Sequence, residues 1–398
     1  MKSMLLRAGS DRTSLTDYGW YRIRVELATS SLLHTRLIHN LRKRQVPENL
    51  VGWISSFLTG RTTNLKFDDY TSEPLQASTG IPQGSPISPI LYLFYGADLL
   101  EITEVSQRDR FTAGYIDDTM LAATSKTIEE NVAKLEEMAS EALKWSDTHA
   151  CKFDVTKFQL IHFTRNQRKY RELPVTVADH QVLPTETAKY LGIILDRRLR
   201  WREQVERATS VGTSTMLAVA RLSKSTRGLP QRYAMQLYRS VVQPKVEFGL
   251  PVWYEPIRKG DGDKRKKGSV GVARKLGKVQ RLAARVITGG FRTTATEVLD
   301  YHAGLPPIEV HLNQVVFNAA VRMATLPNHH PLRRSIKRCI NLYPRYHRSP
   351  IHELFHTFPE IRALETIDTT PTDPSQQSNI EVIIAPSKEE AMEDAERV

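Results

Sequence analysis

Cysteine and long apolar runs are scarce in this chain of 398 residues. Its two cysteines, Cys151 and Cys339, are too few for a disulfide framework or a zinc knuckle, which fits a reduced, intracellular compartment. No stretch approaches the roughly 20 apolar residues of a membrane span, and the N-terminus lacks the apolar core of a signal peptide. We therefore expect an intracellular protein without a membrane segment. Cytoplasm and nucleus are equally compatible with these absences.

Acidic residues are also in deficit. The chain has 56 Lys and Arg against 44 Asp and Glu, which gives a formal charge of +12. Such a surface attracts polyanions and can bind nucleic acid with release of counterions. The alternative is an ordinary basic surface covered by solvent, so charge alone leaves nucleic-acid binding as one of two interpretations.

The order of apolar and β-prone segments predicts an α+β fold. Helical spacing marks residues 32–46, 50–58, 90–100 and 128–145, and the chain from 201 to 242 is also helical in pattern. Residues 62–67 are β-prone and a second strand follows toward 78, with Asp68-Asp69 between them as a turn. Further β-prone runs lie at 111–116, 119–123, 158–163 and 190–195.

The most informative pair of residues is Asp117-Asp118, which lies between two β-prone runs. A hairpin would place both carboxylates in one small volume, where their repulsion is costly unless cations are bound. Two Mg²⁺ ions would remove this repulsion and could promote in-line phosphoryl transfer. The competing interpretation is simple turn chemistry, which Asp68-Asp69 illustrates elsewhere in the chain.

The order of several motifs separates these interpretations. A loop of Gly, Pro and Ser covers residues 80–89 and precedes an apolar helix, and Tyr115-Ile116-Asp117-Asp118 follows downstream. Lys152-Phe153-Asp154 with Lys157 comes next, and then Lys189-Tyr190-Leu191-Gly192. Together with His34-Thr35-Arg36-Leu37, this set resembles the reverse transcriptases of LINE-type (non-LTR) retrotransposons, fungal ones in particular, over most of residues 30–360. The ordered set is specific, whereas each motif alone is weak.

The resemblance implies a role for each matching residue. Asp117 and Asp118 would bind Mg²⁺ or Mn²⁺, and Lys157 would act beside the triphosphate. Tyr115 would pack beneath the primer terminus. The remaining residues expected to contact template, primer or nucleotide are Gly80, Pro82, Gln83, Gly84, Ser85, Tyr190, Leu191 and Gly192. The implied partners are an RNA template, a DNA primer and deoxynucleoside triphosphates.

One expected carboxylate is missing from the resemblance. The family has a further Asp on a strand about ten positions before the His-Thr-Arg-Leu helix, and here that position is Arg24. A guanidinium stays protonated and cannot bind Mg²⁺. Glu26 would lie on the same strand face but about 6–7 Å away. We therefore expect a degenerate and truncated reverse transcriptase, lacking part of the fingers and without a visible endonuclease or RNase H domain.

The expected fold is a right-hand polymerase palm, an antiparallel sheet with helices, followed by a helical thumb or connection region. Residues 1–30 form an aberrant N-terminal segment, and residues 31–196 form the palm with partial fingers. Residues 197–365 form the helical region. Residues 366–398 are polar and acidic and are expected to be a flexible tail or linker.

Other interpretations remain open. The chain could be a catalytically inactive nucleic-acid-binding remnant, and an RNA-dependent RNA polymerase is a weaker option. His352-Glu353-Leu354-Phe355-His356 matches the zinc-protease pattern, as a remote alternative. The basic run at 264–267 is expected in an exposed loop and, with the basic residues up to Arg285, is predicted to contact nucleic acid; a solvated surface or a nuclear-import signal are alternatives.

Overall fold

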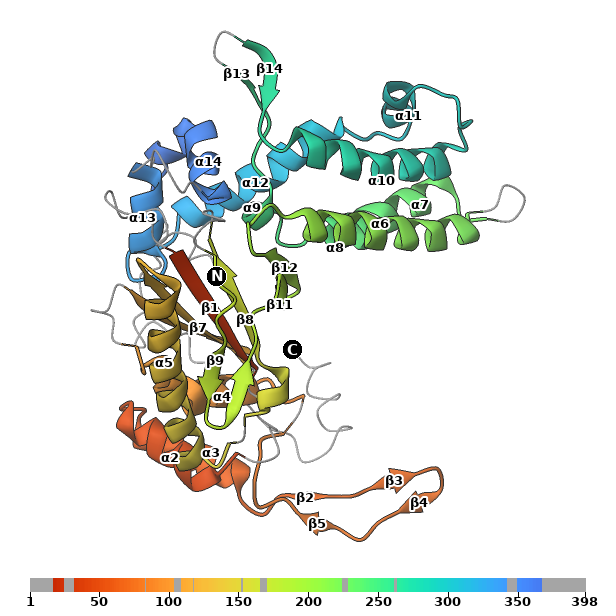
Figure 1. Cartoon of the computed structure of the whole chain (residues 1–398). Helices are drawn as coiled ribbons and strands as arrows, with labels where there is room; N and C mark the ends of the chain where they lie inside the picture. The colour runs from red at the N-terminus through yellow and green to blue at the C-terminus, as the bar shows by residue number, and fades with distance from the viewer. Residues whose placement is uncertain are drawn as a thin grey trace.

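The computed structural model describes residues 17–24, 32–82, 84–103, 109–116, 118–151, 153–164, 170–223, 228–260, 263–341 and 349–366. A sheet backed by helices occupies one half of the molecule, and a group of helices occupies the other half (Figure 1). Two β-hairpin arms project from opposite ends of the molecule. No helix within these residues is both long enough and apolar enough to cross a membrane. The expected C-terminal tail lies almost wholly outside the described residues.

The central element is an antiparallel sheet of four strands in the order β6-β7-β1-β8. The strands are β1 (Asp17–Arg24), β6 (Arg110–Tyr115), β7 (Asp118–Ser125) and β8 (Gln159–Phe163). The first strand in the chain is thus an interior strand of the sheet, held by β7 on one side and β8 on the other. Local periodicity did not predict this strand, although the resemblance placed one at Arg24. The assignment of residues 1–30 to a segment outside the palm was wrong for residues 17–24, because they pair with β7 and β8.

The sheet separates two hydrophobic cores. Along β7, Leu121 and Ala123 pack into one core, whereas Met120 and Ala122 pack into the other. This division follows from the two-residue period of a strand, which directs successive side chains to opposite faces. Strand β7 is therefore apolar on both faces. The first core is completed by the helices α2 (His34–Lys43), α3 (Glu48–Leu58), α4 (Ser88–Leu100) and α5 (Ile128–Thr148).

The first arm extends from α3 as a long, narrow hairpin. It is built from two short antiparallel pairs, β2 (Thr62–Thr63) with β5 (Leu75–Gln76) and β3 (Lys66–Phe67) with β4 (Tyr70–Thr71). Asp68 lies in its terminal turn with a φ of 46°. The predicted strands and turn are confirmed here, and Asp68-Asp69 lies at the tip of an arm remote from the four-stranded sheet (Figure 1).

Short elements connect the sheet to the helices. They are η1 (Val155–Lys157) and the hairpins β9 (Val175–Val177) with β10 (His180–Val182) and β11 (Thr187–Tyr190) with β12 (Ile193–Asp196). At the end of β12, the Asp196 carboxylate accepts hydrogen bonds from the backbone N–H groups of Arg198, Arg200 and Trp201, at 3.1, 3.0 and 2.6 Å. This carboxylate therefore sets the direction in which the next helix leaves the palm.

The second half is helical, which confirms the α+β fold with a helical region after the palm. Its elements are α6 (Arg202–Leu222), α7 (Gln231–Leu237), the π-helical η2 (Tyr238–Val242), α8 (Gln243–Val246), α9 (Leu250–Trp253), α10 (Val270–Thr288), α11 (Thr296–His302), α12 (Ile308–Ala324), α13 (Arg333–Asn341), α14 (Pro350–Thr357) and η3 (Pro359–Ala363). Helices α6 and α10 pack together, and Gly212 faces Val246 and Val279 at this crossing.

The basic run at 264–267 is not a loop. It belongs to β14 (Asp263–Lys267), which pairs with β13 (Arg258–Gly260) in the second arm. The expectation of a loop was based on the flanking glycines, which favour turns. It was wrong because the basic run itself pairs with β13. Composition alone did not show that Arg258 and Lys259 would pair across the turn with Lys267 and Lys266.

Candidate active site and nucleic-acid surface

The Asp pair lies at a β-hairpin, as the sequence predicted. Strands β6 and β7 end in the pair Tyr115 and Asp118, which leaves Ile116 and Asp117 as a two-residue connection. Asp117 itself lies outside the described residues. Ile116 has a φ of 53°, which is an uncommon and costly conformation for a β-branched residue. Such strain is typical of functional turns, where the surrounding structure fixes the backbone.

Strand β1 brings Arg24 to the same place. In the register of β1 with β7, Arg24 is the direct partner of Asp118. Partners across an antiparallel pair have Cβ atoms about 4.5–5.5 Å apart. The strand that the resemblance assigns to the missing Asp is therefore present in the sheet, and its terminal position next to the Asp pair carries an arginine.

The other neighbour of β1 is β8, and the predicted Lys157 lies just before that strand. Arg22 pairs with Gln159 of β8, and η1 immediately precedes that strand and contacts β1. Lys157 is an exposed residue of η1 and forms an ion pair with Asp154 at 3.0 Å. Hydrogen bonds from Thr156 and then from Lys157 keep the pKa of the Asp154 carboxyl below its ordinary value. Tyr115, Asp118 and Arg24 thus lie at the same end of their strands, and η1 contacts β1.

The described residues do not by themselves form a two-metal centre. Within the described part of the chain, no group of three or more His, Cys, Asp and Glu residues could hold a metal ion. Reverse transcriptase domains use divalent metal ions, and two adjacent ions need several carboxylate ligands to offset their repulsion. Asp117, which lies outside the described residues, and Asp118 could supply two such ligands, and the position of β1 that pairs with Asp118 is Arg24.

The Gly-Ile-Pro-Gln-Gly loop lies beneath helix α4. Gly80 has a φ of 80°, and its carbonyl accepts a hydrogen bond at 2.7 Å from Nε2 of His34. Its N–H donates to the Leu32 carbonyl at 2.8 Å. The His of the His-Thr-Arg-Leu motif therefore anchors the loop. This contact joins two motifs that lie 46 residues apart in the sequence.

The second half of the loop is open to solvent. Gly84 has a φ of 91°, and a Cβ atom at this position would meet nothing within 4 Å. Gln83 lies outside the described residues, and Ser85 is partly exposed. Ser88 donates its hydroxyl to the Pro82 carbonyl at 2.6 Å, which ties the loop to the start of α4. The open glycine agrees with a surface that a ligand could approach closely, and the binding role of the loop stays a prediction.

The two predicted tyrosines have opposite environments. Tyr115 is 60% exposed at the sheet edge, whereas Tyr190 is 3% exposed in the core. Tyr115 therefore has a free surface for a ligand, and the ring of Tyr190 has a packing role. Leu191 and Gly192 form the turn after Tyr190, with φ values of 46° and 82°. The Gly192 carbonyl accepts a hydrogen bond at 2.9 Å from Arg207 of α6, so this turn is held against the helical region.

A groove between α6 and α10 was missed by the sequence analysis. Its volume is about 530 Å³, and Lys275 and Lys278 lie along one side. The other side is lined by Glu206 and Leu217 and by the hydroxyl residues Thr209, Ser210, Thr213 and Ser214. Hydroxyl groups and lysines are common contacts to phosphate oxygens. The repeated Ser and Thr on one face of α6 was the available sequence signal.

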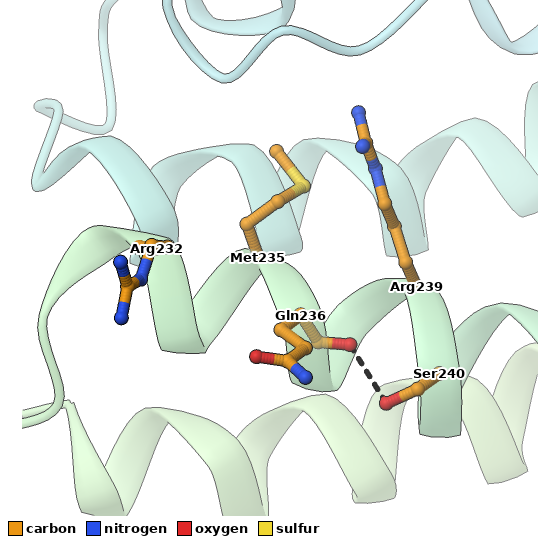
Figure 2. A pocket seen from close by; sticks show the side chains of 5 residues that line it. All are labelled: Arg232, Met235, Gln236, Arg239 and Ser240. Atoms are coloured by element: carbon orange, nitrogen blue, oxygen red, sulfur yellow. Dashed lines mark hydrogen bonds between the residues drawn. The ribbon is translucent and has the colours of Figure 1, made fainter.

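A second depression lies on α7 and η2 (Figure 2), with a volume of about 440 Å³. Arg232, Met235 and Gln236 line it, together with Arg239 and Ser240. Both guanidinium groups have structural contacts: Arg239 donates to the Gly304 carbonyl at 3.0 Å, and Arg232 lies over the Tyr233 ring at 4.8 Å. Arg239 therefore ties η2 to the turn at Gly304, and Arg232 contacts the next residue of its own helix.

The zinc-protease pattern has a structural explanation. His352 is buried, with Nδ1 at 2.8 Å from the Ser349 hydroxyl and Nε2 at 3.3 Å from Cys339 Sγ. Glu353 is paired with Arg258 at 3.0 Å. The first His therefore caps helix α14, and the Glu anchors the second arm. Neither side chain is arranged as the protease pattern requires.

Comparison with known proteins defines the class of this domain. Residues 30–195 match the family model described as reverse transcriptase (RNA-dependent DNA polymerase). This range contains the Gly80 loop, the Asp hairpin, η1 and the β11–β12 hairpin. Residues 30–195 are therefore similar to a reverse transcriptase domain.

The curated relatives make this assignment more specific. The chain is 27% identical over 235 residues to the RNA-directed DNA polymerase from mobile element jockey of Drosophila melanogaster, covering 58% of this chain and 25% of the relative. It is 25% identical over 214 residues to the probable RNA-directed DNA polymerase from transposon X-element of the same species, covering 53% and 23%. The chain is thus similar, over part of its length, to the reverse transcriptases of LINE-type retrotransposons. The chain spans about a quarter of the length of these relatives, and its resemblance to fungal elements stays a prediction.

Among solved structures, the chain has a weak similarity to telomerase from Candida tropicalis in complex with a TWJ fragment of telomeric RNA. The TM-score is 0.43 at 9% sequence identity, covering 83% of this chain and 50% of that chain.

Proposed function

We propose that this chain binds an RNA template and a DNA primer in a reverse transcriptase palm, and that its rate of DNA synthesis is very low. Template, primer and deoxynucleoside triphosphate would meet at the sheet edge that carries Tyr115 and Asp118. The observation that carries the proposal is the pairing of Arg24 with Asp118. Binding depends on distributed positive charge, whereas catalysis depends on charge at this one edge.

The repulsion between the Arg24 guanidinium and a metal ion would be large compared with the free energy that changes a reaction rate tenfold. At 4 Å and an effective dielectric of about 20, two unit charges of like sign repel by about 4 kcal/mol. A divalent cation beside a guanidinium would experience about twice this repulsion before screening. Since each 1.36 kcal/mol of barrier slows a reaction about tenfold, even partial repulsion reduces the rate by orders of magnitude. Asp118 would instead be neutralised by Arg24 across the strand pair.

Primer extension on an RNA template, with Mg²⁺ or Mn²⁺, tests catalysis. We expect no extension by the unmodified chain and measurable extension by the Arg24→Asp variant, which loses it again when Asp118→Asn is added. Arg202→Asp is the matched control, because Arg202 is 76% exposed and lies outside the palm. Robust extension by the unmodified chain that Asp118→Asn abolishes would refute the proposed loss of activity.

Fluorescence anisotropy with an RNA–DNA hybrid tests binding separately. We expect the unmodified chain and the Asp118→Asn variant to bind the hybrid with affinity that falls steeply with salt, because the contacts are to phosphates. A chain that is folded but does not bind the hybrid at low salt would contradict the binding half of the proposal, whatever the extension assay shows.

A further inference from the structure

The β13–β14 arm is a basic two-stranded ribbon. It projects beyond the helices at the top of Figure 1, at the end of the molecule opposite to the first arm. Arg258 pairs with Lys267, and Lys259 pairs with Lys266, so both described pairs of basic residues place like charges directly across the ladder. Lys259, Lys266 and Lys267 are exposed, as is Arg265.

This arrangement is unfavourable for the arm alone. An isolated two-stranded hairpin is marginally stable in water, and like charges directly opposite each other destabilise a strand pair. Two acidic residues offset part of this cost. Glu353 of α14 pairs with Arg258 at 3.0 Å, and Glu309 of α12 pairs with Lys266 at 2.5 Å.

In each cross-strand pair, one basic residue is held by an ion pair and the other is not part of these two ion pairs. Each ion pair involves one member of a cross-strand pair and ties it to the helices. The other members, Lys259 and Lys267, face solvent on a ribbon whose base is held in place. A polyanion laid along the ribbon would reduce the remaining repulsion, and a fixed base reduces the conformational entropy lost on binding.

We propose that this arm binds double-stranded DNA outside the polymerase cleft. The major groove of B-form DNA is about 12 Å wide and admits a two-stranded β-ribbon, whereas the major groove of A-form RNA is deep and narrow. The arm projects from the helical region on the side away from strands β1, β7 and β8 (Figure 1), so its DNA is distinct from the template and primer at the palm. The inference rests on the proposed function in that the ligand is a nucleic acid.

The test compares the full chain with the double variant Lys259→Gln, Lys267→Gln. Binding to a 25-base-pair DNA duplex is measured by anisotropy at several salt concentrations. We expect the slope of log affinity against log salt to become shallower by up to about two units, about one for each lost phosphate contact. The matched control is Lys126→Gln, Lys144→Gln, which removes the same charge from two exposed residues of the palm half and should leave the slope unchanged.

A charge reversal separates binding from folding. Lys259→Glu would place opposite charges across the ladder from Lys266, which stabilises a strand pair. This variant should therefore be at least as resistant to thermal denaturation as the parent and yet bind the duplex at least tenfold more weakly. Unchanged affinity in a stable Lys259→Glu variant would overturn the proposal, and the nuclear-import interpretation of residues 264–267 would then be preferred.

Two further comparisons identify the ligand of the arm and separate a failure of this inference from a failure of the proposed function. An RNA duplex of the same sequence should show a smaller change of slope, and a change confined to RNA would overturn the assignment to DNA. The RNA–DNA hybrid reports on the palm. If the chain does not bind the hybrid, while the arm variant still lowers the salt slope for the DNA duplex, only the proposed function is refuted. If the parent and the arm variant have equal salt slopes for the DNA duplex, only this inference is refuted.

Discussion

Arg24 and Asp118 are register partners in the pairing of strands β1 and β7, at the end of the sheet where the β6–β7 hairpin turns. The backbone pairing of these strands is thus present, with an arginine at the position that pairs with Asp118. Fold and chemistry are separable at this position, because strand pairing depends on the backbone and on the apolar faces of β7, whereas metal binding depends on a few carboxylates.

Arg24→Asp should strengthen the binding of Mn²⁺ by at least tenfold, which corresponds to about 1.4 kcal/mol. The change removes a positive charge beside Asp118 and adds a carboxylate there. Free Mn²⁺ can be measured by electron paramagnetic resonance during a titration without nucleic acid. Arg202→Asp makes the same change of charge at a remote, exposed position and should have little effect. Equal affinities for both variants would show that Arg24 does not set the charge at this site.

Ile116→Asn should stabilise the chain by about 1 kcal/mol. Ile116 has a φ of 53°, and a left-handed conformation costs an L-residue about 1–2 kcal/mol, whereas Asn tolerates it better. Chemical denaturation gives the free energy of unfolding. Ile90→Asn is the control, since Ile90 is equally apolar and exposed but lies in helix α4; it should be neutral or slightly destabilising. A loss of stability on Ile116→Asn would show that the Ile side chain has a packing role that outweighs the strain.

Gly212→Ala should destabilise the helical region by about 1–3 kcal/mol through overpacking. A Cβ atom on Gly212 would lie 2.5 Å from Val246 Cγ2 and 3.0 Å from Val279 Cγ1. Gly271→Ala is the matched control on α10, where a Cβ atom would meet nothing within 4 Å. That variant should gain up to about 1 kcal/mol from helix propensity. The two thermal midpoints should move in opposite directions, and a rise in both would mean that α6 can shift to accept the methyl group.

Stability should fall as the pH drops from about 6.5 to 4, in part through His352. Burial lowers the pKa of His352 to about 4, below the value near 6.5 of an unfolded chain. The folded state therefore favours the neutral ring. This contribution is fully present above pH 6.5 and is lost as the pH falls toward 4, to a limit of about 3 kcal/mol.

The measurement is denaturant unfolding at several pH values, with His352→Asn compared with His356→Asn on the same helix. Burial also lowers the pKa of His149 and His162, so all the chains should lose stability in acid. The dependence should be shallower for His352→Asn. Parallel curves for the two variants would contradict the assignment of this loss to His352.

The local sequence predicted the strands and turns whose structure depends on residues close by in the chain. The β6–β7 hairpin and the turn at Asp68 follow from β-prone runs around a short polar turn. The loop from Gly80 follows from residues that allow positive φ. Local periodicity did not reveal strand β1, and the resemblance placed a strand at Arg24 without its position in the sheet, because that position comes from long-range pairing with β7 and β8. The strand at 263–267 was missed for a similar reason, since it depends on pairing with β13.

The sequence by itself determined the class of this protein. The ordered motifs around Gly80, Asp117-Asp118 and Lys157, together with the excess of basic residues, were sufficient to predict a polymerase palm and a polyanionic ligand. Only the tertiary structure decided where charges meet, because proximity across a sheet is set by register. Register placed Arg24 against Asp118 and Lys259 against Lys266. Packing of the helices decided that Glu309 and Glu353 would anchor one side of the basic arm and leave the other side exposed to solvent.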